Sequence, residues 1–353
     1  MKTMKLVFVF VLALGFLIAG ANTAHARITV DKVLAEKTFE VNPDAILLID
    51  HEFGDINCQN WDKNSIYIKV TVHIESGNEQ DAQKIINRIQ LNISGDRNKV
   101  SSICSLNNSS DKVSNISIDI EVFMPKTVGL QLKHKFGSAY IESVGGPTKI
   151  KSEYGSVKII SLLNTDSKMD LSFGSADIEK MTDGNLGINY SSLTLKDGNN
   201  MKIDSKYSDL ELGNLQSGNI TVEGGSAEIK NINSLVLQSK FSSIEVGNLS
   251  GSLQAGTEYG SLEVKFIKAG FSTLDVENKF GGVELGIDKS ASYEVQVQTN
   301  FGDFDYPESL AQFSNKFTTA TGSSYSGKIG KSSGGSSKLI AKSSYGSIEV
   351  SAR

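Results

Sequence analysis

The sequence is poor in the residues that carry most protein chemistry. Its 353 residues include four histidines, two cysteines and one tryptophan. It contains no Cys-x-x-Cys pair, no phosphate-binding glycine loop and no Gly-x-Ser-x-Gly nucleophile motif. The sequence therefore gives no signature of catalysis, and we expect neither an enzyme nor a cofactor.

The histidines do not form a ligand set. His51 and His134 occupy the same position relative to a following phenylalanine, two residues before it, whereas His73 stands alone in an alternating stretch. We expect the first two to be hydrogen-bonded inside the fold; a pair of metal ligands is the alternative.

An excess of positive charge is also lacking. The chain carries 35 basic and 40 acidic residues. Without the two lysines of the leader described next, the net charge is about −7. This balance argues against nucleic acid as a partner and against simple adsorption to anionic lipid.

Long apolar runs are confined to the first 26 residues. Lys2 and Lys5 precede the run LVFVFVLALGFLIAGA, and AHA at 24–26 offers small residues for cleavage. This pattern predicts a secretory signal peptide over 1–26, with an uncleaved anchor as the alternative. We expect an exported protein in the periplasm, on the outer-membrane surface or outside the cell, with no transmembrane segment in the mature chain.

Export would permit a disulfide between the two cysteines, Cys58 and Cys104. The alternative is that Cys58 is a small buried apolar residue, because it lies at a position where other repeats have Ile, Leu or Val.

Glycine, by contrast, is plentiful, with 33 residues, and a short phrase recurs through the chain. The phrase is an aromatic residue, then Gly or Ser, then a small or acidic residue, and between residues 136 and 301 it returns every 17 to 21 residues. GGS at Gly224 fills one position without a ring. The aromatic residues are Phe53, Phe136, Tyr154, Phe173, Tyr190, Tyr207, Phe241, Tyr259, Phe280, Phe301 and Tyr345.

Apolar residues stand four before, three after and five after each aromatic residue, with mostly polar residues between them. Around Tyr207, for example, these are Ile203, Leu210 and Leu212. The alternation predicts two half-buried strands per repeat, separated by a bend where the phase flips. We expect the Gly or Ser after the ring to supply the unusual backbone angles of that bend.

A unit of about 17 residues cannot bury its own apolar face, so stacking of identical units is expected. The prediction is an all-β, single-stranded parallel β-solenoid with coils of 17 to 21 residues; an antiparallel sandwich or barrel is the alternative. We expect the rings to form an internal stack, so that Tyr207→Ala would cost about 3–5 kcal/mol. The predicted core stack is Phe136, Tyr154, Phe173, Tyr190, Tyr207, Phe241, Tyr259, Phe280 and Phe301.

Asparagines recur seven residues after the ring, at Asn214, Asn231 and Asn248, with Asp197 in the same position one repeat earlier. This spacing predicts a ladder of hydrogen-bonded amides along the stack, or turns that favour Asn, or both.

The period fails at both ends. We expect 27–130 to hold a first coil and a β-rich cap or insertion, with a helix over 78–91 capped by Asn78 and strands over 66–74 and 113–125. The regular coils are expected over 131–310. The Gly/Ser-rich segment 311–353 is expected to be a loose final coil or cap.

The repeated aromatic-Gly-Ser phrase, together with FGDINCQNWDKNSIYIKV (53–70) and IEVFMPKTVGLQLKHKFGSAYIES (120–143), resembles a bacterial family called putative adhesins, secreted β-solenoids of unassigned molecular function. The resemblance covers most of residues 39–350. It implies a right-handed β-helix and a cell-envelope location, and it supplies no catalytic residues.

One outward position, four after the ring, collects acids: Asp177, Glu211, Glu228, Glu245, Glu263 and Glu284, with Thr194 between the first two. It is either a solvated face offset by Lys196 and Lys230 or a site for a cation or partner. The main hypothesis is an exported binding or structural protein that presents its strand faces to glycans or envelope proteins. A polysaccharide-active enzyme and a passive scaffold with weak end-to-end self-association are the alternatives.

Overall fold

A computed structural model describes residues 27–107, 116–331 and 336–353. The described chain is nearly all β-strand, with the helix α1 (Glu79–Ile86) and the 3-10 turn η1 (Glu308–Leu310). The predicted all-β class is confirmed, and the predicted leader, 1–26, lies outside the described residues. Among those residues no helix has the length and apolar character needed to cross a membrane.

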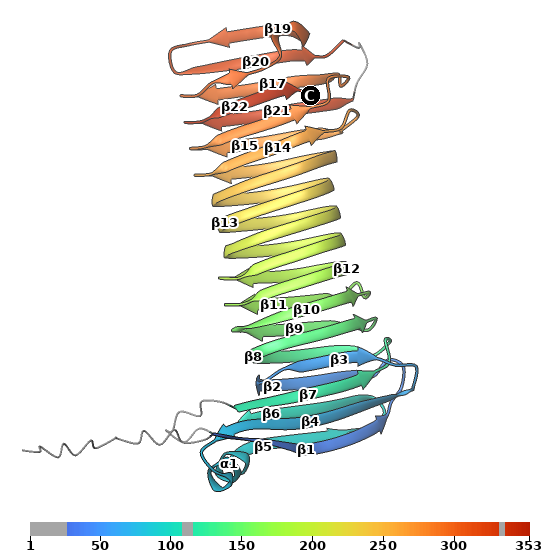
Figure 1. The fold of residues 1–353 in the computed structure, drawn as a ribbon. Helices are drawn as coiled ribbons and strands as arrows, with labels where there is room; N and C mark the ends of the chain where they lie inside the picture. Colours follow the sequence, from blue (N-terminus) through green and yellow to red (C-terminus); the bar gives the residue numbers. More distant parts are fainter. Residues whose placement is uncertain (1–26, 108–115, 332–335) are drawn as a thin grey trace, which may run out of the picture.

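The first part of the chain builds a cap at one end of an elongated molecule (Figure 1). β4 pairs antiparallel with both β1 and β7, β5 pairs antiparallel with β6, and α1 packs on β4. The strands here are β1 (Ile28–Glu40), β2 (Ile46–Phe53), β3 (Ile56–Asn60), β4 (Ser65–Ser76), β5 (Ile89–Gly95), β6 (Lys99–Leu106) and β7 (Ile116–Met124).

The helix begins where the sequence predicts but ends earlier. The Asn78 side chain accepts a hydrogen bond from the backbone N–H of Asp81 at 2.9 Å, as an N-cap does. The helix ends at Ile86, because Ile89 already belongs to β5 and pairs with Leu106. The predicted range 78–91 therefore extends too far, because its last residues, from Ile89 on, belong to the sheet.

The rest of the chain winds into stacked coils, which we call the coil stack. Successive coils pair in parallel and in register, so that Val157 lies beside Ala176, and Ala176 beside Leu193. The strands are β8 (Gly129–Val144), β9 (Thr148–Glu153), β10 (Gly155–Leu162), β11 (Ser167–Ser172), β12 (Ser175–Asn189), β13 (Ser192–Glu258), β14 (Ser261–Ile267), β15 (Thr273–Lys279), β16 (Gly282–Ile287), β17 (Tyr293–Asn300), β18 (Phe304–Asp305), β19 (Ala311–Thr318), β20 (Gly322–Ile329), β21 (Ser337–Ser344) and β22 (Ser347–Ala352).

Near each end of the described chain, two strands lie between strands that are distant from them in the sequence. β2 lies between β6 and β8, and β3 lies between β7 and β8. At the far end β21 lies between β15 and β17, and β22 lies between β16 and β18. The expectation of a loose final coil is therefore wrong, because the last strands are clamped on both sides. The antiparallel pair β19–β20 covers this end instead.

The interior is a set of columns, each built from equivalent residues of successive coils. The positions four before, three after and five after the ring point inward, and Ile203, Leu210 and Leu212 are all buried. Cys58 and Cys104 are buried and free, so the predicted disulfide is wrong. Burial raises the pKa of the Cys58 thiol to about 12 and that of Cys104 to about 11, which keeps both thiols protonated.

The small residue after the ring is also inward, and it lies against the next coil. A Cβ built on Gly174 would collide with the carbonyl oxygen of Gly155, and one on Gly281 would collide with that of Gly260. Gly174 and Gly281 have no positive φ, so the close approach of the backbones is what requires glycine there. Gly54 and Gly137, which follow Phe53 and Phe136, have φ values of 114° and 124°, so in these two coils the glycine does supply the unusual backbone angles that the sequence suggested.

The histidine pair lies in one of the inner columns. His51 and His134 are adjacent in register, with ring centroids 6.3 Å apart and planes 5° from parallel. Their Nε2 atoms contact backbone carbonyl oxygens, of Ile118 at 2.5 Å and of Gly54 at 3.0 Å. The expected hydrogen-bonded role is confirmed, and desolvation lowers the pKa of both rings, that of His51 to about 4.

Replacing Gly281 by Ala should lower the free energy of unfolding by about 1–3 kcal/mol, because the added methyl group overlaps the Gly260 carbonyl. Urea unfolding measures the loss. Gly77→Ala is the matched control, since no atom lies within 4 Å of its would-be Cβ, and its change should stay within about 0.5 kcal/mol. Equal stability of the two variants would contradict the close packing of coils.

Stability should fall as the pH drops from 6.5 towards 4. The unfolded chain binds a proton on His51 near pH 6.5, whereas the folded chain binds it only near pH 4. This difference in pKa corresponds to a contribution of about 3 kcal/mol to the free energy of unfolding, which is present above pH 6.5 and lost near pH 4. His51→Ser should flatten the pH dependence of urea unfolding in this window; an unchanged slope would contradict the assignment.

Candidate functional site

Most aromatic residues of the repeat have left-handed backbone angles, which non-glycine residues seldom adopt. Their φ values lie between 50° and 58°. Because all of them stand at the same corner of the coil, the strain is repeated along the whole stack. These residues are Tyr154, Phe173, Tyr190, Tyr207, Phe241, Tyr259, Phe280, Phe301 and Tyr345.

The left-handed turn points the rings outward. Around Tyr207, Ser205 and Ser208 are buried, whereas Lys206 and Tyr207 are both exposed. The ring residue is thus the extra residue that flips the phase of the alternation, as in a β-bulge. The predicted internal position of the rings is wrong: they are 44–59% exposed from Tyr154 onward.

The rings nevertheless stack, and we call the array the aromatic ladder. Neighbouring centroids are 4.7–5.4 Å apart and neighbouring planes are within 18° of parallel. Tyr345 of the threaded last coil lies between Phe280 and Phe301. The ladder consists of two runs, Phe53–Phe136–Tyr154–Phe173–Tyr190–Tyr207 and Phe241–Tyr259–Phe280–Tyr345–Phe301, which are separated by the coil of Gly224.

Polar side chains border the ladder on both sides. On the side before the ring, Lys206 pairs with Glu223 at 3.3 Å and Lys240 pairs with Glu258 at 3.5 Å. On the other side, Ser226 donates a hydrogen bond to Asp209 at 2.6 Å. The ladder is therefore a narrow apolar stripe with charged and hydroxyl groups along its margins.

The predicted acidic positions also stand in register. Glu245 lies beside Glu263 and Glu263 beside Glu284, and the predicted set also includes Asp177, Glu211 and Glu228. Lys265 forms an ion pair with Glu245, whose hydrogen bond raises the pKa of that lysine. Among the described residues no three His, Cys, Asp or Glu side chains are grouped as metal ligands. The ion pair with Lys265 is what the solvated-face interpretation expects, and a site for a cation or partner stays the alternative prediction.

The asparagine position forms a hydrogen-bonded column. Asn214 donates to Asp197 at 2.7 Å, Asn231 to Asn214 at 2.7 Å, and Asn248 to Asn231 at 2.9 Å. A second column, which the sequence reading missed, runs from Asp183 through Asn200 to Ser217, with bonds of 2.9 and 2.8 Å. The only signal for this second column in the sequence is the spacing of 17 residues. Both columns join side chains of successive coils and therefore stabilise the stack.

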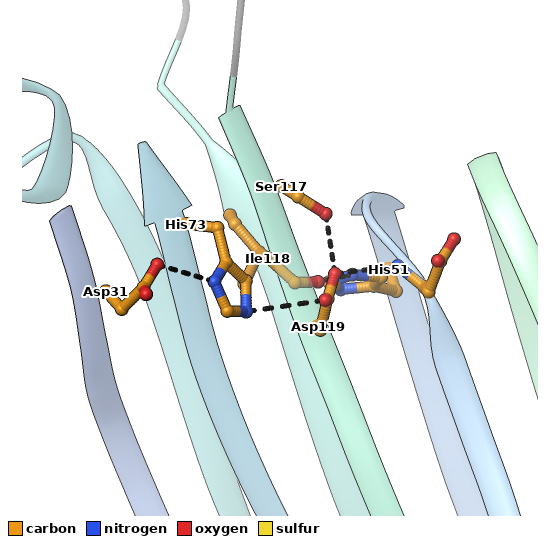
Figure 2. Close-up of polar contacts among 7 residues, drawn as sticks. Asp31, His51, His73, Ser117, Ile118 and Asp119 are labelled. Atoms are coloured by element: carbon orange, nitrogen blue, oxygen red, sulfur yellow. Dashed lines mark hydrogen bonds and ion pairs between the residues drawn. The ribbon is translucent and has the colours of Figure 1, made fainter. Parts of the chain in front are cut away.

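A separate polar cluster lies on the outer face of the cap (Figure 2). His73 is placed between two carboxylates, with Nδ1 2.8 Å from Asp31 and Nε2 3.4 Å from Asp119. Ser117 donates its hydroxyl to Asp119 at 2.5 Å rather than to His73. A nucleophile and base would need a direct bond between Ser and His, so this arrangement ties β1, β4 and β7 together and does not form a catalytic pair.

The family comparison matches the coil stack together with most of the cap. A family model described as Toastrack DUF4097 matches residues 47–351, from β2 to β22. The chain belongs to the Toastrack DUF4097 family. No curated protein matches this Toastrack chain.

Solved structures with similarity to the Toastrack chain include a putative adhesin from Parabacteroides distasonis, 12% identical, which covers 90% of this chain and 97% of its own with a TM-score of 0.33. A putative adhesin from Bacteroides fragilis is 13% identical, with coverages of 90% and 97% and a TM-score of 0.30. A putative lipid binding protein from P. distasonis is 10% identical; the similarity covers 90% of this chain and 96% of that protein, with a TM-score of 0.30. The family match and the adhesin names confirm the resemblance noted from the sequence, while TM-scores this low carry no argument about function.

Because the ladder faces solvent, Tyr207→Ala should cost only about 0.5–1.5 kcal/mol, the value of aromatic stacking beyond burial. Ile203→Ala, on the inward side of the same coil, should cost about 2–5 kcal/mol. Urea unfolding of the two variants compares them directly. A larger loss for Tyr207→Ala than for Ile203→Ala would contradict the outward position of the rings.

Proposed function

We propose that this chain is an exported cell-envelope binding protein whose aromatic ladder is the binding face for extended glycan chains. The observation that carries the proposal is the ladder itself: large apolar side chains exposed in two continuous runs along the stack. A contiguous exposed apolar surface of this length on a folded protein usually marks a binding site.

Backbone strain supports the same conclusion. A left-handed non-glycine residue costs about 1–2 kcal/mol, whereas stacking of one ring returns about 0.5–1.5 kcal/mol. Glycine would be cheaper at each corner, and Gly224 occupies one with a φ of 69°. Since the fold does not require a ring there, the repeated rings serve something other than stability, and strained residues often mark functional sites.

The shape and chemistry of the ladder favour a glycan over other ligands. A narrow stripe that runs straight across many coils suits an extended polymer. Ring edges contact the C–H faces of sugar residues, while Lys206, Glu223, Asp209 and their counterparts offer donors and acceptors for hydroxyl groups. The ring spacing of about 5 Å is close to the length of one sugar residue in an extended chain.

The proposal includes the finer parts of the architecture. We assign the coil stack to a right-handed, single-stranded parallel β-solenoid, because parallel crossovers within one sheet are nearly always right-handed. The division into a leader (1–26), a first coil with a cap or insertion (27–130), regular coils (131–310) and a C-terminal coil or cap (311–353) belongs to the proposal. Export to the periplasm, the outer-membrane surface or the exterior belongs to it as well.

The other hypotheses have less support. For a polysaccharide-active enzyme, the acids that stack in register are offset by lysines such as Lys265, and they lie on an open strand face. For an end-to-end scaffold, α1 with its cap covers one end of the stack and the β19–β20 pair covers the other (Figure 1). Envelope proteins remain the alternative ligand class for the ladder.

A glycan array tests the proposal with a triple variant of the first run, Tyr154→Asn, Phe173→Asn and Tyr190→Asn. Asn tolerates the left-handed conformation, so the coils should be retained. The variant should bind the glycans that the wild type retains at least tenfold more weakly, because three consecutive rings are removed.

The matched control is Glu228→Gln, Glu245→Gln and Glu263→Gln on the acidic face, which should bind as the wild type does. Loss of binding in the acidic variant with normal binding by the ring variant would place the ligand on the wrong face. An array on which the wild type retains no glycan would also contradict the proposal.

A further inference from the structure

The aromatic ladder is interrupted at one coil. Gly224 takes the left-handed conformation of the ring residues, with a φ of 69°, but carries no side chain. Tyr207 on one side stacks on Tyr190 at 5.1 Å, and Phe241 on the other stacks on Tyr259 at 5.1 Å. Each run therefore ends at the Gly224 coil with one ring face that no ring of the ladder covers.

These two ring faces are unlike the rest of the ladder. In the continuous runs, each ring covers the face of the next, so that solvent reaches mainly ring edges. Tyr207 and Phe241 are 57% and 59% exposed, a level close to that of Phe301 and Tyr345, so the uncovered ring faces rather than the overall exposure set these two rings apart. Ring faces carry the negative side of the aromatic quadrupole, to which polarised C–H groups are attracted.

The opening has the thickness of a saturated ring. Tyr207 and Phe241 lie two coils apart, which corresponds to about 9.6 Å at the usual strand spacing of about 4.8 Å. In the continuous runs an interval of this size is filled by one aromatic ring, whose centroid lies about 5 Å from each neighbour. The opening at Gly224 therefore admits one ring-sized group, and a puckered sugar ring, whose hydrogens project from both faces, has this thickness.

The floor and the margins of the opening suit the same ligand. A Cβ at position 224 would lie only 2.8 Å from Cδ1 of Tyr207, so this ring leans over the glycine and leaves no bare backbone below it. Glu223, paired with Lys206, lies at one margin, and Ser226, bonded to Asp209, lies at the other. Carboxylate, ammonium and hydroxyl groups around two apolar walls match the hydroxyl rim of a sugar.

A hollow continues from the opening across the neighbouring coils. It is lined by Thr221, Glu223, Gln238, Lys240, Gly256 and Glu277. Further residues of a glycan chain that enters the opening can lie in this hollow.

We infer that the Gly224 coil forms a slot that holds one pyranose ring of a glycan between the faces of Tyr207 and Phe241. The inference rests on the proposed function and adds a defined position, a stoichiometry of one slot per chain and a mode of contact. The sugar stacks on both rings through its C–H groups, and its hydroxyl groups bond to the margins formed by Glu223, Lys206, Ser226 and Asp209.

Isothermal titration of the full-length mature chain with soluble hexasaccharides tests the slot. The probes are hexamers of glucose, of N-acetylglucosamine and of galacturonic acid. Wild type should bind at least one of them at one site per chain. Gly224→Phe fills the slot with the ring that other coils carry and should weaken binding at least tenfold, although it lengthens the ladder.

Wall variants cover the case in which Gly224→Phe folds poorly. Phe241→Leu removes one wall and should weaken binding at least tenfold, whereas Phe173→Leu should weaken it much less, because it removes one ring of a continuous run and no wall of the slot. Tyr154→Gly opens a second slot between Phe136 and Phe173 and should raise the stoichiometry to two.

Wild-type affinity in both Gly224→Phe and Phe241→Leu overturns the slot but leaves the ladder as the binding face. Equal weakening by Phe241→Leu and Phe173→Leu does the same, and so does a stoichiometry of one in Tyr154→Gly. Absence of binding by the wild type to every hexasaccharide overturns the slot and the glycan proposal together.

Discussion

Parallel pairing of each coil with the next, in register, is the constraint on which the rest of the structure depends. Apart from an irregularity between Val264 and Ile267, the register is kept, so equivalent residues of successive coils lie side by side. Apolar positions become a continuous core, asparagines become a hydrogen-bonded column, and aromatic residues become a ladder. A contact that contributes little in one coil, such as a single amide hydrogen bond or ring stack, recurs in the coils above and below, and the contributions add up.

The same constraint separates the residues that stabilise the coils from those of the proposed binding face. The interior columns, such as that of Ile203 and Ile220, exclude solvent and hold the coils together. The ladder stands on the outer corner, where it adds stacking energy but also left-handed strain. Changes to the ladder can therefore alter what the surface binds while the core remains intact.

The sequence predicted the apolar columns and the asparagine column, because both follow directly from period-2 alternation and a constant repeat length. It misplaced the rings because the flip in phase was assigned to the residues after the aromatic residue. The overlooked signal is that the residue directly after the ring is always small. This Gly or Ser belongs to the same inward-facing set as the apolar residues three and five after the ring, such as Leu210 and Leu212. That reading would have left the ring outside.

The threaded chain ends could not be predicted from the repeat. Periodicity tells which residues are equivalent but not the order in which coils are stacked, so Tyr345 appeared to belong beyond Phe301 rather than between Phe280 and Phe301. The end of α1 was missed for a related reason: Ile89 fits a helical stripe, yet it pairs with Leu106 in a sheet whose partner lies 17 residues away. Tertiary pairing decided both cases.

Hydroxyl-radical footprinting of the mature chain, with and without a bound glycan, tests the central claim most directly. The account predicts that Tyr154, Phe173, Tyr207 and Phe241 are oxidised readily in the free protein and protected by the glycan, whereas the buried Tyr293 is unreactive in both states. Unreactive ladder rings in the free protein, or protection confined to the acidic face at Glu245 and Glu263, would contradict it.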